Sequence, residues 1–141
     1  MQRVIIVDGH SVIFASDELR TLHDRDQPAA RQQLIDDLNH YQDITGANVV
    51  LVYDGKQTKR GQAGGTNSEI LVLYSKNGQT ADSVIERIVA QKAAKFDITV
   101  ASNDRMELDT VAAFGGHCMS ARSLLEDIDR QLGNFRREWG I

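Results

Sequence analysis

Covalent and conformational constraints are scarce in this sequence. The 141 residues include one cysteine, Cys118, and one proline, so no disulfide can form within the chain. A lone cysteine is typical of proteins in a reducing compartment, and Met1 leads directly into a strand-like segment without a signal-peptide pattern. We therefore expect a cytoplasmic protein. No apolar run approaches the roughly 18 residues that a membrane-spanning helix needs, so we expect no membrane partner.

Motifs of several enzyme classes are also missing. The chain has no P-loop and no GxGxxG segment for a nucleotide cofactor, and no GxSxG segment for acyl transfer. Its four histidines and single cysteine lack the spacing of a zinc site. The formal charge of -4 argues against a broad basic surface that coats nucleic acid. With 41% hydrophobic residues, the composition is that of an ordinary globular protein, and we expect one domain over residues 1–141.

Apolar runs typical of strands alternate with segments of helical periodicity. Because strands separated by helices pair in parallel through right-handed crossovers, the pattern predicts a three-layer α/β/α sandwich with a mostly parallel sheet. A polar connection is expected from residue 16 to Gln27, and an irregular segment over 55–68. The predicted strands are residues 3–7, 48–53, 70–74, 98–101 and 117–119, and the predicted helices are 11–15, 28–46, 80–95, 104–114 and one beginning near residue 120.

Acidic residues follow three of the predicted strands. Asp8 and Asp54 come directly after apolar runs, and Asp104 lies just beyond residues 98–101. The carboxyl ends of parallel strands line the crevice where ligands bind, and Asp82 begins a helix that could reach the same place. Clustered carboxylates repel one another unless cations neutralise them, and hard divalent cations prefer oxygen ligands. The sequence therefore predicts a metal-dependent phosphodiester or phosphoryl-transfer site.

Each acid also has a structural interpretation. Asp8 with Gly9 can form an Asx-type turn, and Asp82 is favoured near a helix N-terminus by the helix dipole. Asp104 can cap the helix that begins beside it. The argument for a shared site depends on all four acids occupying matching positions in the topology.

Neighbouring polar residues add candidates for supporting roles. Ser11 can bond the Asp8 carboxylate or cap a helix, and His10 can contact a substrate phosphate or simply lie in the turn. Glu107 is expected to be exposed, with a supporting role at the site as the alternative.

Basic residues gather in the irregular segment after Asp54. Lys56, Lys59 and Arg60 are candidates for contacts to substrate phosphates, which position a nucleic acid without reading its sequence. A solvated surface is the alternative interpretation of this group.

The first predicted strand and its following turn resemble the opening of a known family. Residues 4–13 read VIIVDGHSVI, which is similar to the LLVDGYNVI opening of NYN-domain proteins of the YacP type, a branch of the PIN-like nucleases. Further segments resemble motifs of this family in the same order along the chain. They are residues 31–46 in the first long helix, VVLVYDG at 49–55, LVLYSKNGQTADSVIER at 71–87, VASNDRMELDTVAAFGG at 100–116 and SARSLLEDI at 120–128.

The resemblance implies a PIN-like fold and metal-dependent endoribonuclease activity, including cleavage of messenger RNA on the ribosome. It assigns the acidic metal-binding positions of the family to Asp8, Asp82 and Asp104, with Asp54 as a further acid at the same mouth. Mg²⁺ or Mn²⁺ held there would activate water for in-line attack on the phosphodiester. The family's DGYN reads DGHS here, so Ser11 replaces an asparagine that orients the first aspartate.

Two other functions remain open at this point. One is an RNA- or ribosome-binding module that keeps the fold but has little cleavage activity, which the substitution at Ser11 and the acidic net charge favour. The other is a small-molecule phosphohydrolase on the same kind of sheet. Fold alone does not separate these from an endoribonuclease.

Overall fold

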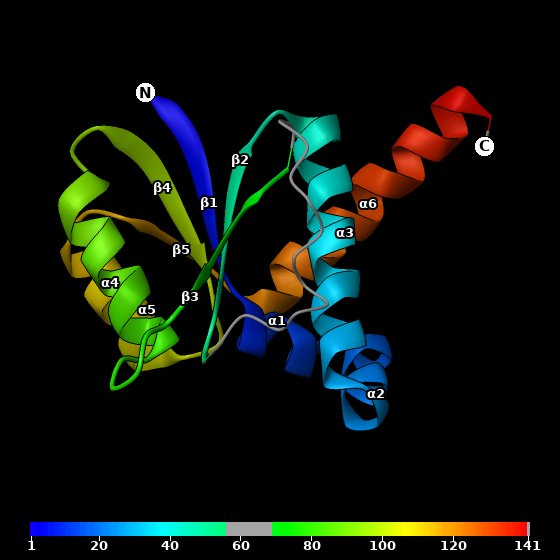
Figure 1. The fold of residues 1–141 in the computed structure, drawn as a ribbon. Coiled ribbons are helices and arrows are strands. Elements are labelled where there is room, and N and C mark those ends of the chain that lie inside the picture. The colour runs from blue at the N-terminus through cyan, green and yellow to red at the C-terminus, as the bar shows by residue number, and fades with distance from the viewer. Residues whose placement is uncertain (56–68, 141) are drawn as a thin grey trace.

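The protein, described as a computed structural model over residues 1–55 and 69–140, is built around one parallel sheet with helices on both faces (Figure 1). The α/β class and the parallel pairing predicted from the sequence are confirmed. The strands are β1 (Gln2–Asp8), β2 (Asn48–Tyr53), β3 (Leu71–Tyr74), β4 (Phe96–Ala101) and β5 (His117–Met119). The helices are α1 (Gly9–Ala15), α2 (Asp17–Arg25), α3 (Gln27–Thr45), α4 (Ala81–Lys92), α5 (Arg105–Ala113) and α6 (Ala121–Trp139).

The strand order determines where a ligand can bind. The sheet runs β3-β2-β1-β4-β5, so the chain builds outward from β1 to β3 and then crosses back to place β4 on the other side of β1. In the register, Asp8 lies opposite Val52 of β2, and Val7 lies opposite Ala101 of β4. In open α/β sheets the ligand crevice lies where the strand order reverses. Here that position is the carboxyl end of β1 and β4.

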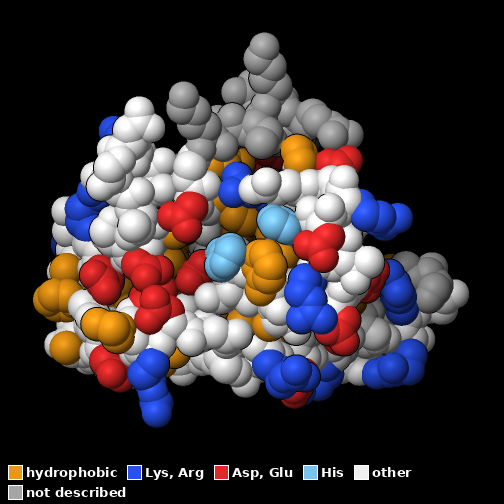
Figure 2. Space-filling model, turned by 90° about the horizontal axis from the view of Figure 1, so that it is seen from below, with side chains coloured by type: hydrophobic (Ala, Val, Ile, Leu, Met, Phe, Trp, Pro, Cys, Tyr) orange, Lys and Arg blue, Asp and Glu red, His pale blue; other side chains and the backbone are white. Residues whose placement is uncertain are grey.

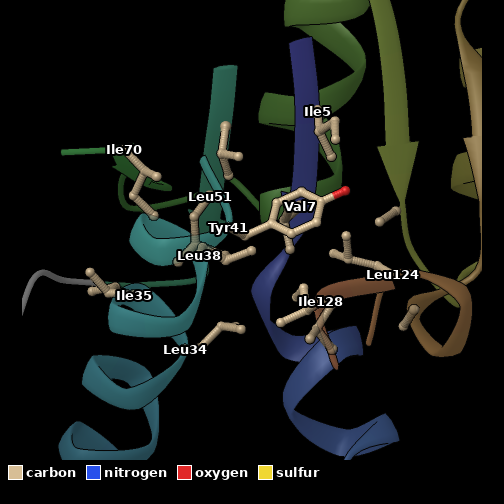
Figure 3. Close-up of a cluster of buried hydrophobic side chains, with 14 of the residues drawn as sticks. Ile5, Val7, Leu34, Ile35, Leu38, Tyr41, Leu51, Ile70, Leu124 and Ile128 are labelled. Carbon is tan, nitrogen blue, oxygen red and sulfur yellow. The ribbon is translucent and has the colours of Figure 1, made fainter. Parts of the chain in front are cut away.

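Two apolar cores hold the helices against the sheet. One core joins α1, α3 and α6 to one face, and Figure 3 shows its side chains reaching from β1, β2, α3 and α6 toward one another. The other core joins α4 and α5 to the opposite face. Each fully buried aliphatic side chain contributes about 1.5–3 kcal/mol to these contacts. The first core includes Ile5, Val7, Leu34, Leu38, Tyr41, Leu51, Leu124 and Ile128, and the second includes Ile6, Val52, Ile85, Val89, Val100 and Val111.

Close packing at Gly9 fixes the turn out of β1. A Cβ atom at Gly9 would lie 2.3 Å from Cε1 of Tyr53, so no larger residue fits unless that ring moves. The ring has little freedom, because Tyr53 is 1% exposed and its hydroxyl donates to the carbonyl of Arg31 at 3.0 Å. Consequently α1 begins immediately after Asp8 and holds that carboxylate at the edge of the sheet.

The structure differs from the sequence prediction at residues 17–25, where α2 replaces the expected polar connection. Ser16 caps this helix, with its Oγ accepting from the amide of Leu19 at 3.1 Å. Asp17 and Glu18 occupy the first turn, where the helix dipole favours negative charge. Only Leu19 is buried, and Leu22 is the only other aliphatic side chain of α2, so few apolar residues mark this helix in the sequence.

The two longest helices pack across one end of the first core. α3 ends at Gly46, whose φ of 74° is in the left-handed region that suits glycine. The Tyr41 hydroxyl donates to Asp127 of α6 and so links the two helices. Among the described residues, no helix combines the length and apolar character needed to cross a membrane.

Candidate active site

Three carboxylates from three different elements meet at the reversal of the strand order. Asp8 ends β1, Asp82 lies in the first turn of α4, and Glu107 lies in the first turn of α5. One oxygen of each lies within 4.8 Å of the others. Asp8 is 5% exposed and Glu107 is 1% exposed, whereas Asp82 is partly exposed. Carboxylates that are this close and this buried repel one another when ionised, so the arrangement favours either shared protons or a bound cation.

Two serine hydroxyls organise this carboxylate group. The Ser11 hydroxyl donates to Oδ2 of Asp8 at 3.0 Å, which is one of the roles that the sequence left open for this serine. Oγ of Ser102, a fully buried residue, lies 3.2 Å from the same oxygen and 3.1 Å from Oε2 of Glu107. The amide of Asp104 donates to Ser102 Oγ at 3.0 Å. Since a hydroxyl has one proton, Ser102 can donate to Asp8 or to Glu107 but not to both at once.

The environment of Glu107 is unusual for an acid. Burial and the nearby side chains of Asp82 and Asp8 raise its pKa from 4.5 to about 9. Its Oε1 is buried and has no hydrogen-bond partner among the described residues. Burial also raises the pKa of Asp82, with the neighbouring Asp104 adding to the effect. The group therefore holds protons that a cation would displace.

Asp104 lies beside this group and caps α5. Its Oδ1 accepts from the amides of Met106 at 3.0 Å and Glu107 at 3.2 Å. The Asp82 side chain and these two amides lower the pKa of Asp104. Asp104 is partly exposed and is not one of the three carboxylates whose oxygens lie within 4.8 Å. The structure thus places it at the mouth, next to Asp82.

Asp54 is exposed, and its side chain accepts a hydrogen bond from the backbone of α4. Its Oδ1 accepts from the amide of Ala81 at 2.6 Å, at the first residue of the helix that carries Asp82. Thr80 caps the same helix, with its Oγ1 accepting from the amide of Ser83 at 3.1 Å. Asp54 is therefore placed to hold α4 rather than to join the carboxylate group directly.

The predicted substrate-binding residues fall in two places. His10 is exposed on α1. Acidic side chains gather on one face of the molecule, and histidine side chains lie beside them there (Figure 2). Lys56, Lys59 and Arg60 lie outside the described residues, so their predicted contacts to phosphates stay predictions.

Two residues of the site were not identified from the sequence. Glu107 was expected to be exposed, and this was wrong, because its side chain points into the carboxylate group. Its spacing of four from Val111, the other buried residue of α5, was the available signal for an inward direction. Ser102 was not singled out as a candidate, although it follows β4 directly, at the same edge as Asp8.

The fold and these acids define a class of protein before any relative is considered. A parallel α/β sheet with buried carboxylates at its reversal point agrees with the PIN-like architecture that the family resemblance implies. The chain belongs to the YacP-like NYN domain family, whose model matches residues 5–139. The predicted family is therefore confirmed, and it connects the chain with nucleases and RNA.

Relatives of the chain are known from Bacillus subtilis. It is 32% identical over 127 residues to the uncharacterized protein YacP of strain 168, which covers 89% of this chain and 75% of that protein. It is also similar to the crystal structure of Rae1 (YacP), with a TM-score of 0.83 and 30% identity, over 97% of this chain and 79% of that one. A mutant form of Rae1 gives a TM-score of 0.80 at 27% identity, over 95% of this chain and 79% of that one.

Proposed function

We propose that the protein is a metal-dependent endoribonuclease that hydrolyses RNA at the carboxyl edge of its sheet. The observation that carries this proposal is the group formed by Asp8, Asp82 and Glu107, in which three carboxylates converge and one buried oxygen has no partner among the described residues. Membership of the NYN family supports a nuclease. Asp104, at the mouth of the group, is the further acid that the family resemblance assigns to the metal.

The residues present fit a hard divalent cation. The donors are carboxylate oxygens, which Mg²⁺ and Mn²⁺ prefer, and the group found among the described residues contains neither histidine nor cysteine. Asp8 and Asp82 would hold the ion with Glu107, and Asp104 would contribute from the mouth. When bound, the ion supplies an activated water and stabilises charge on the phosphate.

The chain's own residues orient and shield this group. The hydroxyls of Ser11 and Ser102 fix the Asp8 carboxylate, and Ser102 also contacts Glu107. Asp54 acts by fixing the start of α4 and therefore the position of Asp82. Because Ser11 makes the hydrogen bond to Asp8, the replacement of the family asparagine does not remove the orienting contact.

RNA is the proposed substrate, and messenger RNA on the ribosome is the form that the family resemblance implies. Lys56, Lys59 and Arg60 follow Asp54 closely in sequence, and His10 lies two residues after Asp8. These residues are proposed to contact the RNA backbone, which would balance the acidity of the chain locally.

The experiment that tests this function combines cleavage with direct metal binding. Purified wild type is incubated with single-stranded and structured RNAs in Mg²⁺ or Mn²⁺, beside Asp8→Asn, Asp82→Asn and Glu107→Gln. Asp109→Asn is the matched control, because Asp109 is an exposed acid of α5. Mn²⁺ binding, followed by electron paramagnetic resonance, reports on the site independently of cleavage.

Each outcome assigns the function differently. Cleavage and Mn²⁺ binding that are lost in the three variants, and kept in Asp109→Asn, would support the proposal. RNA binding without cleavage would favour the binding module, and turnover of a generic phosphate ester without RNA cleavage would favour the phosphohydrolase. Cleavage that survives all three substitutions would rule out this site.

A further inference from the structure

A row of aromatic rings lies on α1 and α2. The His10 and Phe14 rings are 4.5 Å apart between centroids, and the Phe14 and His23 rings are 5.0 Å apart. We call His10, Phe14 and His23 the aromatic row. His10 and Phe14 lie on one face of α1 because they are four residues apart. Phe14 is 37% exposed, although Val12 and Ile13 beside it in the sequence are buried.

The aromatic row borders the carboxylate group. His10 lies between Asp8 and Ser11 in the sequence, and α1 begins directly at the end of β1. Figure 2 shows two histidine side chains flanking a hydrophobic one, beside the gathered acidic side chains on the same face of the molecule. A small cavity of about 40 Å³ is lined in part by the row, Arg31 and Asp54. His10 therefore joins the row to the end of β1, where Asp8 belongs to the carboxylate group.

Arg31 adds a fixed positive charge to this cavity. Its guanidinium carbon lies 4.7 Å from the centroid of the Tyr53 ring, and Nη2 donates to the carbonyl of Asp54 at 3.1 Å. Tyr53 is buried and cannot move with the ligand. Within the described ranges the Arg31 guanidinium forms no ion pair with a carboxylate. A pinned cation without a carboxylate partner suits an anionic group of the ligand, such as a phosphate.

The chemistry of this surface matches an unpaired nucleotide. Every nucleobase has a π-face that stacks on phenylalanine or histidine, and the phosphate beside it carries the charge that Arg31 would neutralise. A base within a duplex is already stacked and paired, so it cannot enter such a row without being extruded. The combination of exposed rings, a fixed cation and nearby carboxylates selects a single strand.

We propose that the aromatic row and Arg31 form a subsite for an unpaired nucleobase of single-stranded RNA, next to the scissile phosphate at the carboxylate group. This proposal rests on the proposed function, and it specifies the substrate class as single-stranded at the nucleotide adjacent to the cut. Phe14 and His10 stack on the base, and Arg31 binds a phosphate of the same strand. Stacking tolerates all bases, so the subsite reads strandedness and not sequence.

Fluorescence of 2-aminopurine tests the subsite without depending on cleavage. A short single-stranded RNA that carries this base, and a duplex of the same sequence, are titrated with wild type in CaCl₂. The variants are Phe14→Ala, Phe14→Trp, His10→Ala and Arg31→Gln. The matched control is Phe114→Ala, since Phe114 is 50% exposed and lies at the end of α5. His10 is exposed, so His10→Ala remains informative if Phe14→Ala unfolds.

The expected result is a loss of single-strand affinity of about 5- to 150-fold in Phe14→Ala, because stacking of one base typically contributes that much. Phe14→Ala should also lose the quenching of 2-aminopurine. His10→Ala should show weaker quenching than wild type, and Phe14→Trp should keep it. Arg31→Gln should weaken single-strand binding while leaving the quenching of the bound base in place. The variants should bind the duplex with the affinity of wild type. Phe114→Ala should match wild type in both affinity for the single strand and quenching.

The subsite is overturned if Phe14→Ala and His10→Ala bind the single strand as wild type does, with the same quenching. Equal losses on the single strand and the duplex would also overturn it, since they indicate a general effect. If wild type stacks the base on the row but cleaves no RNA in Mn²⁺, the proposed function fails and the subsite stands. If wild type cleaves RNA but substitutions in the aromatic row change neither single-strand affinity nor quenching, only the subsite fails.

Discussion

The two halves of the carboxyl edge are built in opposite ways. The acid half draws Asp8, Asp82 and Glu107 from a strand and two helices on both sides of the sheet's reversal point, and two of the three are nearly inaccessible to solvent. The aromatic half lies on two short consecutive helices, α1 and α2, and presents its rings outward. The difference indicates that the acid half is preorganised by tertiary packing, whereas the rings of the aromatic row come from neighbouring segments of the chain and only Arg31 depends on tertiary contacts.

The halves also differ in how their polar groups are satisfied. In the acid half, Ser11 and Ser102 connect the carboxylates, and one oxygen of Glu107 is left without a partner among the described residues. In the aromatic half, the fixed polar group is Arg31, which rests on the buried Tyr53 ring. A buried carboxylate without a partner is costly, so the acid half should respond strongly to charge and pH. The aromatic half should respond mainly to loss of contact area.

The largest expected effect is the loss of a carboxylate from the acid half. Replacing Asp8 or Asp82 by asparagine, or Glu107 by glutamine, should reduce RNA cleavage in Mn²⁺ by more than the roughly 10–100-fold typical for residues that only support a metal ligand. The reason is that the charge neutralising the cation is removed. Initial cleavage rates at saturating RNA measure the effect.

If these carboxylate substitutions leave the initial rate of RNA cleavage within a few-fold of wild type, the acid half is not the catalytic part of the edge. Asp109→Asn serves as the control here too, and its rate should equal that of wild type.

A smaller loss is expected when the acids stay and their organising hydroxyl is removed. Ser102→Ala deletes the group that touches Asp8, Glu107 and the amide of Asp104, so the carboxylates are held less firmly. Mn²⁺ affinity should fall by about 10–100-fold. Titration followed by electron paramagnetic resonance measures the dissociation constant. Ser123→Ala, which changes an exposed serine of α6, is the control, and an unchanged constant in Ser102→Ala would show that Ser102 is only a packing residue.

The metal-free protein should become less stable as the pH rises. In the folded chain the pKa of Glu107 is raised from 4.5 to about 9, whereas the unfolded chain has the ordinary value. The folded state then keeps a proton that the unfolded state has lost, so the stabilisation is complete below about pH 4.5 and is lost as the pH approaches 9. In EDTA, we expect the midpoint of thermal unfolding to fall between about pH 5 and about pH 9.

Glu107→Gln should flatten this pH dependence, because an amide is uncharged throughout that range. In EDTA, the midpoint of thermal unfolding of Glu107→Gln should be higher than that of wild type near pH 9. A slope that stays as steep in Glu107→Gln would mean that a group other than Glu107 takes up the proton.

The smallest effect is expected at Asp54, which lies where the two halves meet. Its carbonyl accepts from Arg31 of the aromatic half, and its side chain accepts from the amide of Ala81 in the acid half. Asp54→Ala should lower the free energy of unfolding by about 0.5–2 kcal/mol, as for other helix-capping contacts. Denaturant titration measures this, with Thr80→Ala as a comparison that removes the neighbouring cap.

Mn²⁺ affinity in Asp54→Ala should fall less than in Ser102→Ala. A loss of cleavage as large as that of Asp8→Asn would instead show that Asp54 binds the cation itself.

The positions of the strands and of their terminal acids followed from the sequence. Apolar runs such as residues 48–53 need burial on both faces, and this requirement predicts a parallel sheet. Asp8 was expected at the carboxyl edge because it follows an apolar run, and it lies there as the last residue of β1, although it is only 5% exposed. The hydrogen bond of Ser11 to Asp8 was one of two roles that the sequence left open, and it is a local contact because the two residues are three apart at the start of α1.

The direction of Glu107, the contacts of Ser102 and the helix α2 were decided by tertiary structure. A glutamate on a short helix faces outward by default, and Glu107 faces inward only because β1 and α4 bring Asp8 and Asp82 to the same point. Ser102 meets Asp8 because β1 and β4 are adjacent, although 94 residues separate the two in sequence. Leu19 is the only buried residue of α2, so the segment has too few apolar side chains to stand out from a polar connection in the sequence. Sequence patterns report local burial, whereas the joining of distant polar groups depends on the order of the strands.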